Sequence, residues 1–178
     1  MSGLLDIWRQ VAGKWSEVSG QVRDDQWDNP TPCDEWTVRQ LVDHTLGWQA
    51  EGGRLIGADV VPGDDWDRIR TAFDAHLADS NRLAGTVEAF AGIPKHDLVG
   101  LLIGDLLIHS WDLARSIGAD EALPPDAVEA TTVGLHHAPP ALLRGTDPLG
   151  HKMMAAAREV PIDASAQDKM LAFTGRRP

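Results

Sequence analysis

The long apolar run between Leu98 and Ile117 constrains the fold of this chain more than any other stretch. Its apolar residues fall on nearly every side of a helix drawn over 97–117, and a helix with that pattern is buried rather than surface-lying. Asp105 and His109 stand four residues apart within it, so both side chains share one helical face. An unpaired carboxylate or imidazole loses on the order of several kcal/mol when it leaves water. The run therefore predicts a central helix whose buried acid and imidazole are paired or bind a ligand.

The rest of the chain also has a helical pattern. Apolar residues recur at three- and four-residue steps over 4–20, 37–56, 65–91, 97–117, 124–138 and 164–174. Thr37 and Gln40 form a capping box at the start of the second helix, and Asp163 is expected to cap the last one. The segment 28–35 is expected to be a loop, whereas 142–161 is compatible with a short helix or a strand, with 160–162 extended. Because no strand pair is convincing, the pattern predicts an all-α four-helix bundle with short additional C-terminal helices.

Composition narrows the class of protein. A chain of 178 residues is long enough for one domain spanning 1–178. Its net charge of −11 argues against nucleic acid or an anionic membrane as a partner, because phosphates bind basic patches. No apolar run is long enough to cross a bilayer, and the N-terminal segment lacks the apolar core of a signal peptide. Cys33 is the single cysteine, which excludes an intrachain disulfide, so we expect a cytoplasmic protein.

The buried acid and imidazole have a third candidate partner. His44 is expected on the inward face of the second helix, where it can meet Asp105 and His109. Helical bundles build metal sites in this way, from inward side chains on facing helices. Two imidazoles and one carboxylate suit Zn²⁺ or another divalent first-row metal, with a position left for water or substrate. The spacing alone leaves a simpler interpretation open, in which the acid and one imidazole form a hydrogen-bonded pair and the other imidazole is an ordinary core residue.

Several further side chains are candidates for the surroundings of this site, namely Asp112, Glu51, Trp48, Trp111 and His76. The two acids would act as reserve ligands or would orient the imidazoles, or else they form a cap or an exposed ion pair. The two indoles and the third imidazole would wall a pocket, or else they fill the core. Cys33 lies beside Asp34 and Glu35, whose charges disfavour a thiolate, so we expect no catalytic role for it.

Three phrases of the sequence resemble a known family: NPTPCDEWTVRQLVDH (29–44), HSWDLARSIG (109–118) and DASAQDKMLAFTGRRP (163–178). They are similar to the DinB/YfiT-like superfamily, and more narrowly to its actinobacterial branch related to the N-terminal domain of mycothiol-dependent maleylpyruvate isomerase. The resemblance implies a four-helix bundle that holds a divalent metal, zinc or alternatively nickel, with ligands that fall on His44, Asp105 and His109. Asp105 stands where Glu or His is commoner in the family. Its shorter side chain would hold a metal closer to its helix, less tightly or not at all.

The function that this resemblance implies is thiol chemistry at the metal. A low-molecular-weight thiol of the mycothiol type would bind as a thiolate, with its pKa below the roughly 8.5 of a free thiol. It would attack a small electrophilic substrate, which makes the chain a transferase or an isomerase; a homodimer is compatible with the family. Two other interpretations stay open. One is a non-catalytic bundle that binds a small molecule or dimerises, with a weakened or lost metal site. The other is a structural metal closed by Asp112 or Glu51.

Overall fold

The structure is a computed structural model that describes residues 3–33, 36–90, 92–146 and 153–178, and its regular structure is almost entirely helical. The α-helices are α1 (Leu4–Ser19), α2 (Val38–Ile56), α3 (Trp66–Leu77), α4 (Lys95–Ile117), α5 (Pro125–His137), α6 (Pro140–Leu143) and α7 (Ala166–Phe173). Short 3-10 helices and strands lie between them: η1 (Asp24–Gln26), η2 (Ser80–Leu83), β1 (Thr86–Val87), η3 (Glu88–Phe90) and β2 (Ile93–Pro94). The predicted all-α class with short C-terminal helices is confirmed.

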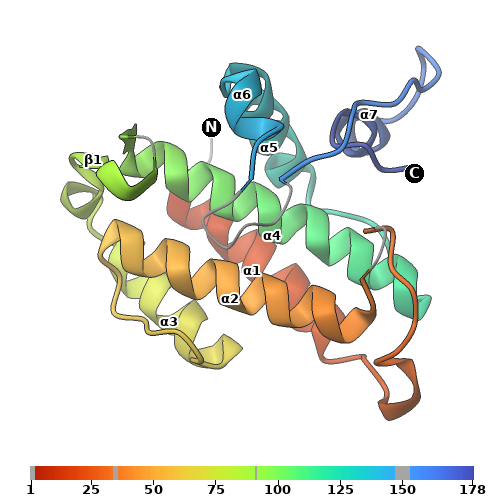
Figure 1. Cartoon of the computed structure of the whole chain (residues 1–178), viewed down its shortest axis with the longest axis horizontal. Helices are drawn as coiled ribbons and strands as arrows, with labels where there is room; N and C mark the ends of the chain where they lie inside the picture. The colour runs from red at the N-terminus through yellow and green to blue at the C-terminus, as the bar shows by residue number, and fades with distance from the viewer. Residues whose placement is uncertain (1–2, 34–35, 91, 147–152) are drawn as a thin grey trace.

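Helix α4 forms the centre of the bundle (Figure 1). It packs against α1, α2 and α5, while α3 packs on α1 and α2, and α7 packs on α5. Buried residues occur all round α4, as the apolar run predicts. Helix α2 approaches α4 closely at Gly52, where a Cβ atom would lie 2.3 Å from Leu102 Cδ2. Although α4 is so apolar, neither it nor any other helix of the described residues has the length and hydropathy needed to cross a bilayer.

The helix predicted over 65–91 is shorter in the structure. Helix α3 begins after the Asp65 cap, as expected, but it ends at Leu77. Asp79 then accepts a hydrogen bond from the backbone of Asn81 and starts η2, and Gly85 turns the chain with a φ of 92°. The apolar residues that continued the helical spacing therefore lie on two 3-10 turns and a strand. Residue 91 lies outside the described residues.

A small hairpin replaces the end of that predicted helix, so the expectation that no strands pair was wrong at this point. Strands β1 and β2 are antiparallel, with Thr86 opposite Pro94 and Val87 opposite Ile93. The hairpin leads directly into α4. Its second strand, through Ile93, contributes to the wall of the cavity described below.

The other predicted helix ends agree with the structure more closely. The Thr37–Gln40 capping box is present at the start of α2, and α5 ends before the proline pair at 139–140. The last helix is capped by Ser165, which accepts from the backbone of Asp168, and not by Asp163. Within 142–161, α6 ends at Leu143, and 153–160 has no regular structure; 147–152 lies outside the described residues. Ile162 lies in a turn rather than in an extended segment.

Candidate metal centre

A cavity of about 1140 Å³ lies between α2, α4, α5 and the C-terminal segment of the chain. Its wall combines parts of the sequence that are far apart: the loop before α2, one face of α4, and residues 153–158 and 174–177. His44, Asp105 and His109 all line it. The cavity brings the three predicted ligands to a surface that a small molecule can reach.

The three predicted ligands come together. One ligand atom from each of His44, Asp105 and His109 lies within 4.8 Å of those of the other two. The His109 Nε2 atom lies 3.4 Å from Asp105 Oδ1, one turn earlier on α4. The ring of His44 stands edge-on to that of His109, with the ring centroids 5.3 Å apart. Helices α2 and α4 therefore present these side chains to one point.

The environment of these side chains fits a divalent cation. The second carboxylate oxygen of Asp105, Oδ2, is buried and has no hydrogen-bond partner. A buried acceptor without a partner is costly, and a cation between α2 and α4 would give it one. Two imidazoles and a carboxylate are ligands that first-row divalent metals accept. The residues present at this point therefore fit the metal that the sequence predicts.

The same contacts shift the pKa values of both α4 residues. Burial alone would raise the pKa of Asp105, but His109, His44 and Arg176 together outweigh it and lower that pKa. Burial alone would lower the pKa of His109, yet the carboxylates of Asp105 and Asp112 raise it well above its ordinary value. Without a metal, a proton on His109 supplies the positive charge that Asp105 faces. A metal would take over this role.

Asp112 is the partner that holds the other side of the His109 ring. Its Oδ2 atom lies 2.9 Å from His109 Nδ1. Arg176, from the C-terminal segment, donates to both carboxylate oxygens, with Nη2–Oδ2 at 2.8 Å and Nε–Oδ1 at 3.2 Å. Burial would raise the pKa of Asp112, but the charge of Arg176 and the bond to His109 hold it far below its usual range. Asp112 is thus an ionised, buried partner of His109.

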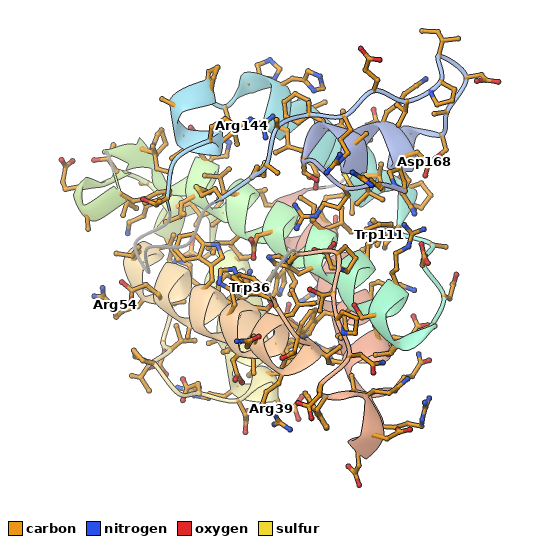
Figure 2. All side chains as sticks on the ribbon, turned by 45° about the vertical axis from the view of Figure 1, so that its right-hand side comes forward. Trp36, Arg39, Arg54, Trp111, Arg144 and Asp168 are labelled. Atoms are coloured by element: carbon orange, nitrogen blue, oxygen red, sulfur yellow. The ribbon has the colours of Figure 1, made fainter. Side chains whose placement is uncertain are left out.

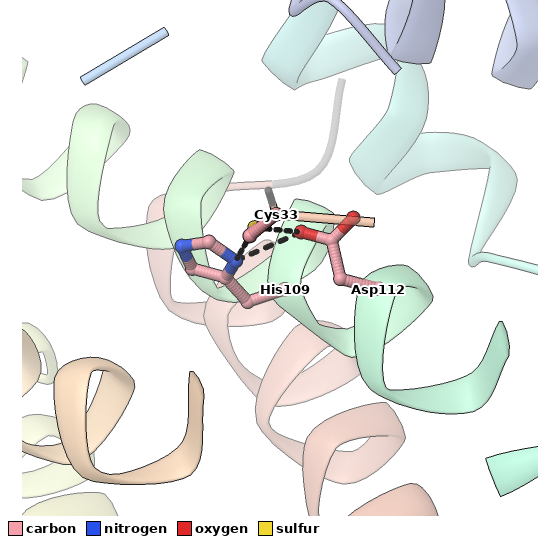
Figure 3. Close-up of side chains that lie close together, drawn as sticks. All are labelled: Cys33, His109 and Asp112. Carbon is pink, nitrogen blue, oxygen red and sulfur yellow. Dashed lines mark hydrogen bonds and ion pairs between the residues drawn. The ribbon is translucent and has the colours of Figure 1, made fainter. Parts of the chain in front are cut away.

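Cys33 completes a second donor group, with His109 and Asp112 (Figure 3). Its thiol donates to Asp112 Oδ2 at 3.3 Å, and its Sγ atom lies 3.9 Å from His109 Nδ1. The Arg176 guanidinium donates to the same sulfur at 3.3 Å. A positive charge therefore already contacts both the sulfur and the carboxylate, and it would repel a cation there. The group of His44, Asp105 and His109 suits a metal better.

Of the other side chains that the sequence predicts around the site, some line the cavity and others do not. Trp48 lines the cavity, but Glu51, Trp111 and His76 are not among the residues that line it. Arg54 donates two hydrogen bonds to the Glu51 carboxylate, from Nη2 at 2.6 Å and from Nε at 2.9 Å. In Figure 2, Arg54 projects from the bundle. Trp111 stands two residues after His109, which turns it to another face of α4, and it packs under Arg115. His76 is buried on α3.

The two acids that the sequence offers as a fourth ligand, which would close the metal site, do not join the three predicted ligands. Neither Asp112 nor Glu51 belongs to the donor group that contains His44. Asp112 is occupied by Arg176 and His109, and Glu51 by Arg54. Among the described residues, no fourth donor joins His44, Asp105 and His109 in this group, whereas a structural zinc site has four protein ligands.

Sequence reasoning missed three contributors to this site. Trp36 packs against His44, with the rings tilted by 46° and their centroids 4.5 Å apart (Trp36 is labelled in Figure 2). The charges of Asp34 and Glu35, which lie outside the described residues, are the sequence argument against a role for Cys33; in the structure its sulfur contacts His109, Asp112 and Arg176. Arg176 lies 64 residues from Asp112 in the sequence. The one signal that included all three was their place in the sequence phrases that resemble the family.

Comparison with known proteins finds a family model and two proteins that are similar to this chain. The family model described as the mycothiol maleylpyruvate isomerase N-terminal domain matches residues 8–91, which include His44 but neither candidate ligand on α4. Two uncharacterized proteins of Mycobacterium tuberculosis, from strains CDC 1551 / Oshkosh and H37Rv, are each 30% identical to this chain over 171 residues. Each alignment covers 91% of this chain and 91% of the relative. No solved structure matches the chain significantly.

Proposed function

This chain belongs to the mycothiol maleylpyruvate isomerase N-terminal domain family, and from that premise we propose that it is a metal- and thiol-dependent enzyme. Its co-substrate would be a low-molecular-weight thiol of the mycothiol type, and its substrate a small electrophile. The reaction would be a transfer of the thiol or an isomerisation that passes through its adduct. Zinc is the favoured metal, with nickel as the alternative.

One observation carries the proposal. His44, Asp105 and His109 converge to within 4.8 Å at the wall of a cavity of about 1140 Å³. A convergent polar group inside a cavity of this size is what a small-molecule site requires. The unpartnered Oδ2 atom of Asp105 supports the proposal, because a cation at this point would satisfy it.

The chemistry can be assigned to residues of the chain. A divalent ion held by His44, Asp105 and His109 would supply a Lewis acid that lowers the pKa of a thiol. Trp36 and Trp48 line the cavity, and the indole of Trp36 packs beside the His44 ring, so both would offer an apolar wall to a substrate. The buried Asp112 accepts from Nδ1 of His109 and so keeps Nε2 directed at Asp105. Among the residues that the structure describes, no side chain stands out as a separate general base.

Metal content tests the proposal first. Protein purified without chelator should hold stoichiometric Zn²⁺ or Ni²⁺, and EDTA should lower its melting temperature. An ion at about 100 times its Kd adds about 2.7 kcal/mol to the free energy of unfolding, so the shift is measurable. His44→Ala should lose the metal, whereas His136→Ala should keep it, because His136 is exposed and does not line the cavity.

The dependence of the reaction on an added thiol tests the second half of the proposal, the thiol chemistry. With mycothiol and a nitroaryl halide, the metal-loaded protein should accelerate adduct formation, and His44→Ala should not. Metal far below stoichiometry and a melt that EDTA leaves unchanged would instead identify a non-catalytic binding bundle. Stoichiometric metal without thiol chemistry would identify a structural site.

A further inference from the structure

The C-terminal turn presents Arg176 from a fixed backbone. Gly175 follows α7 with a φ of 92°, and its backbone donates to Ala172. The backbone of Arg176 donates in turn to the carbonyl of Leu171 at 3.0 Å. A Cβ atom at Gly175 would lie 2.6 Å from the Cβ of Ala155, so the turn also packs closely on the segment before α7. The backbone from which the Arg176 side chain extends is therefore held in place.

The head of Arg176 is equally constrained. Its side chain is 10% exposed, and that of Asp112 is fully buried. The two donor–acceptor pairs between them form a planar, two-pronged contact, which fixes the plane of the carboxylate as well as its charge. The same Nη2 atom donates to the Cys33 sulfur. A lysine, with one ammonium group, cannot fix this plane in the same way.

The position of the carboxylate decides how His109 is turned. Both oxygens of the Asp112 carboxylate accept hydrogen bonds from Arg176, so Asp112 is also the acceptor in its 2.9 Å contact with His109, and the Nδ1 atom of His109 carries the hydrogen. The opposite nitrogen, Nε2, then faces Asp105 and the group that contains His44. A carboxylate that holds one ring nitrogen in this way fixes which nitrogen a metal meets.

We infer that Arg176 is a positioning residue for the candidate metal centre. It holds the Asp112 carboxylate in the plane that directs Nε2 of His109 toward the cation position. The inference rests on the proposed function for the presence of the metal, but not for the orientation of the ring. It assigns a role to a residue outside the 8–91 segment that the family model matches. The end of the chain thereby acts on a ligand in α4.

Zinc affinity of the full chain, measured by competition with a chelator of known affinity, provides the first test. Loss of an outer partner of a metal ligand weakens binding about 10- to 100-fold, so Arg176→Gln should raise the Kd for Zn²⁺ by about this factor. Arg176→Lys should recover part of the loss. Arg70→Gln, at an exposed position on α3 that does not line the cavity, is the matched control and should bind as the unmodified protein does.

Non-additivity separates positioning from a general loss of stability. If Arg176 acts through Asp112, Arg176→Gln should cost little further affinity in a chain that already carries Asp112→Asn. Additive losses in the two variants would overturn the inference. Urea melts of the metal-free variants identify any chain that fails to fold, and Arg176→Lys keeps the test valid in that case, because it retains the charge.

A readout without metal distinguishes this inference from the proposed function. In metal-free protein, the Nδ1–H proton of His109 should give a slowly exchanging low-field NMR signal, and Arg176→Gln should broaden or remove it. An unchanged signal would overturn the inference even if Zn²⁺ binds. Loss of the signal in the variant of a protein that binds no Zn²⁺ would support the role of Arg176 and refute the metal proposal alone.

Discussion

At the scale of single residues, His109 is the central residue of the candidate site. It contacts Asp105 on one side and Asp112 on the other, and both contacts follow from helical spacing within α4. The sequence could therefore predict them. It could not predict Cys33 or Arg176, which lie 76 and 64 residues from their partners on α4 and are brought there by tertiary packing.

The paired state of His109 predicts a pH dependence of the metal-free protein. Its pKa is raised well above the ordinary 6.5, so its contribution to stability is complete below pH 6.5 and is lost as the pH rises through the raised pKa. The pKa of Asp105 is lowered from 3.8, so its contribution is lost only in acid. In EDTA, the melting temperature should be highest between these limits and fall toward alkaline pH.

His109→Gln supplies the comparison for this profile. The variant has no imidazole to lose its proton, so the alkaline decline should be smaller in it than in the unmodified chain. Thermal melts across the pH range measure the melting temperature of both proteins. If the two melting temperatures fall in parallel toward alkaline pH, the role assigned to the His109 proton is contradicted.

At the scale of elements, the prediction was accurate where a cap marks a helix end. The Thr37–Gln40 capping box begins α2, and α4 ends at Ile117, as the helix predicted over 97–117 requires. It failed after Leu77, because apolar residues on 3-10 turns and a short strand reproduced helical spacing over 78–90. Hydrophobic periodicity reports burial, and a compact hairpin against the bundle buries the same positions. Asp79 and Gly85 were the local signals of the break.

The packing of α2 on α4 predicts unequal effects of two glycine substitutions. Gly52→Ala would place a Cβ atom 2.3 Å from Leu102, so it should lower the free energy of unfolding by about 1–3 kcal/mol. Gly47→Ala, on the same helix, meets nothing within 4 Å and should be neutral or stabilising by up to about 1 kcal/mol. Urea denaturation measures both values, and equal effects would refute the close approach of the two helices.

At the scale of the whole molecule, residues near both ends of the chain line one cavity. The wall includes Leu4 in α1, residues of α4 and the turn at 174–177. The family model covers residues 8–91, but the site is complete only with α4 and the C-terminal turn. The sequence predicted the bundle because its helices are each locally encoded. The closure of the cavity depends on contacts across the full length of the chain.

Shortening the chain tests this closure. Removal of 175–178 would leave Asp112 buried without its guanidinium, and breaking such a buried pair should cost about 3–5 kcal/mol in the free energy of unfolding. Removal of Arg177 and Pro178 alone keeps Arg176 and should cost far less. Similar urea midpoints for the two shortened chains would show that the turn contributes no more than its exposed end.

The position of the single sulfhydryl has a practical consequence for any assay. Because Cys33 lines the cavity, a reagent offered as a substrate is also offered to the protein itself. Self-labelling would consume the reagent once per chain without any added thiol, and intact-mass measurement would register it as one adduct. The same sulfhydryl is a unique attachment point for a fluorophore, whose emission would report what enters beside it.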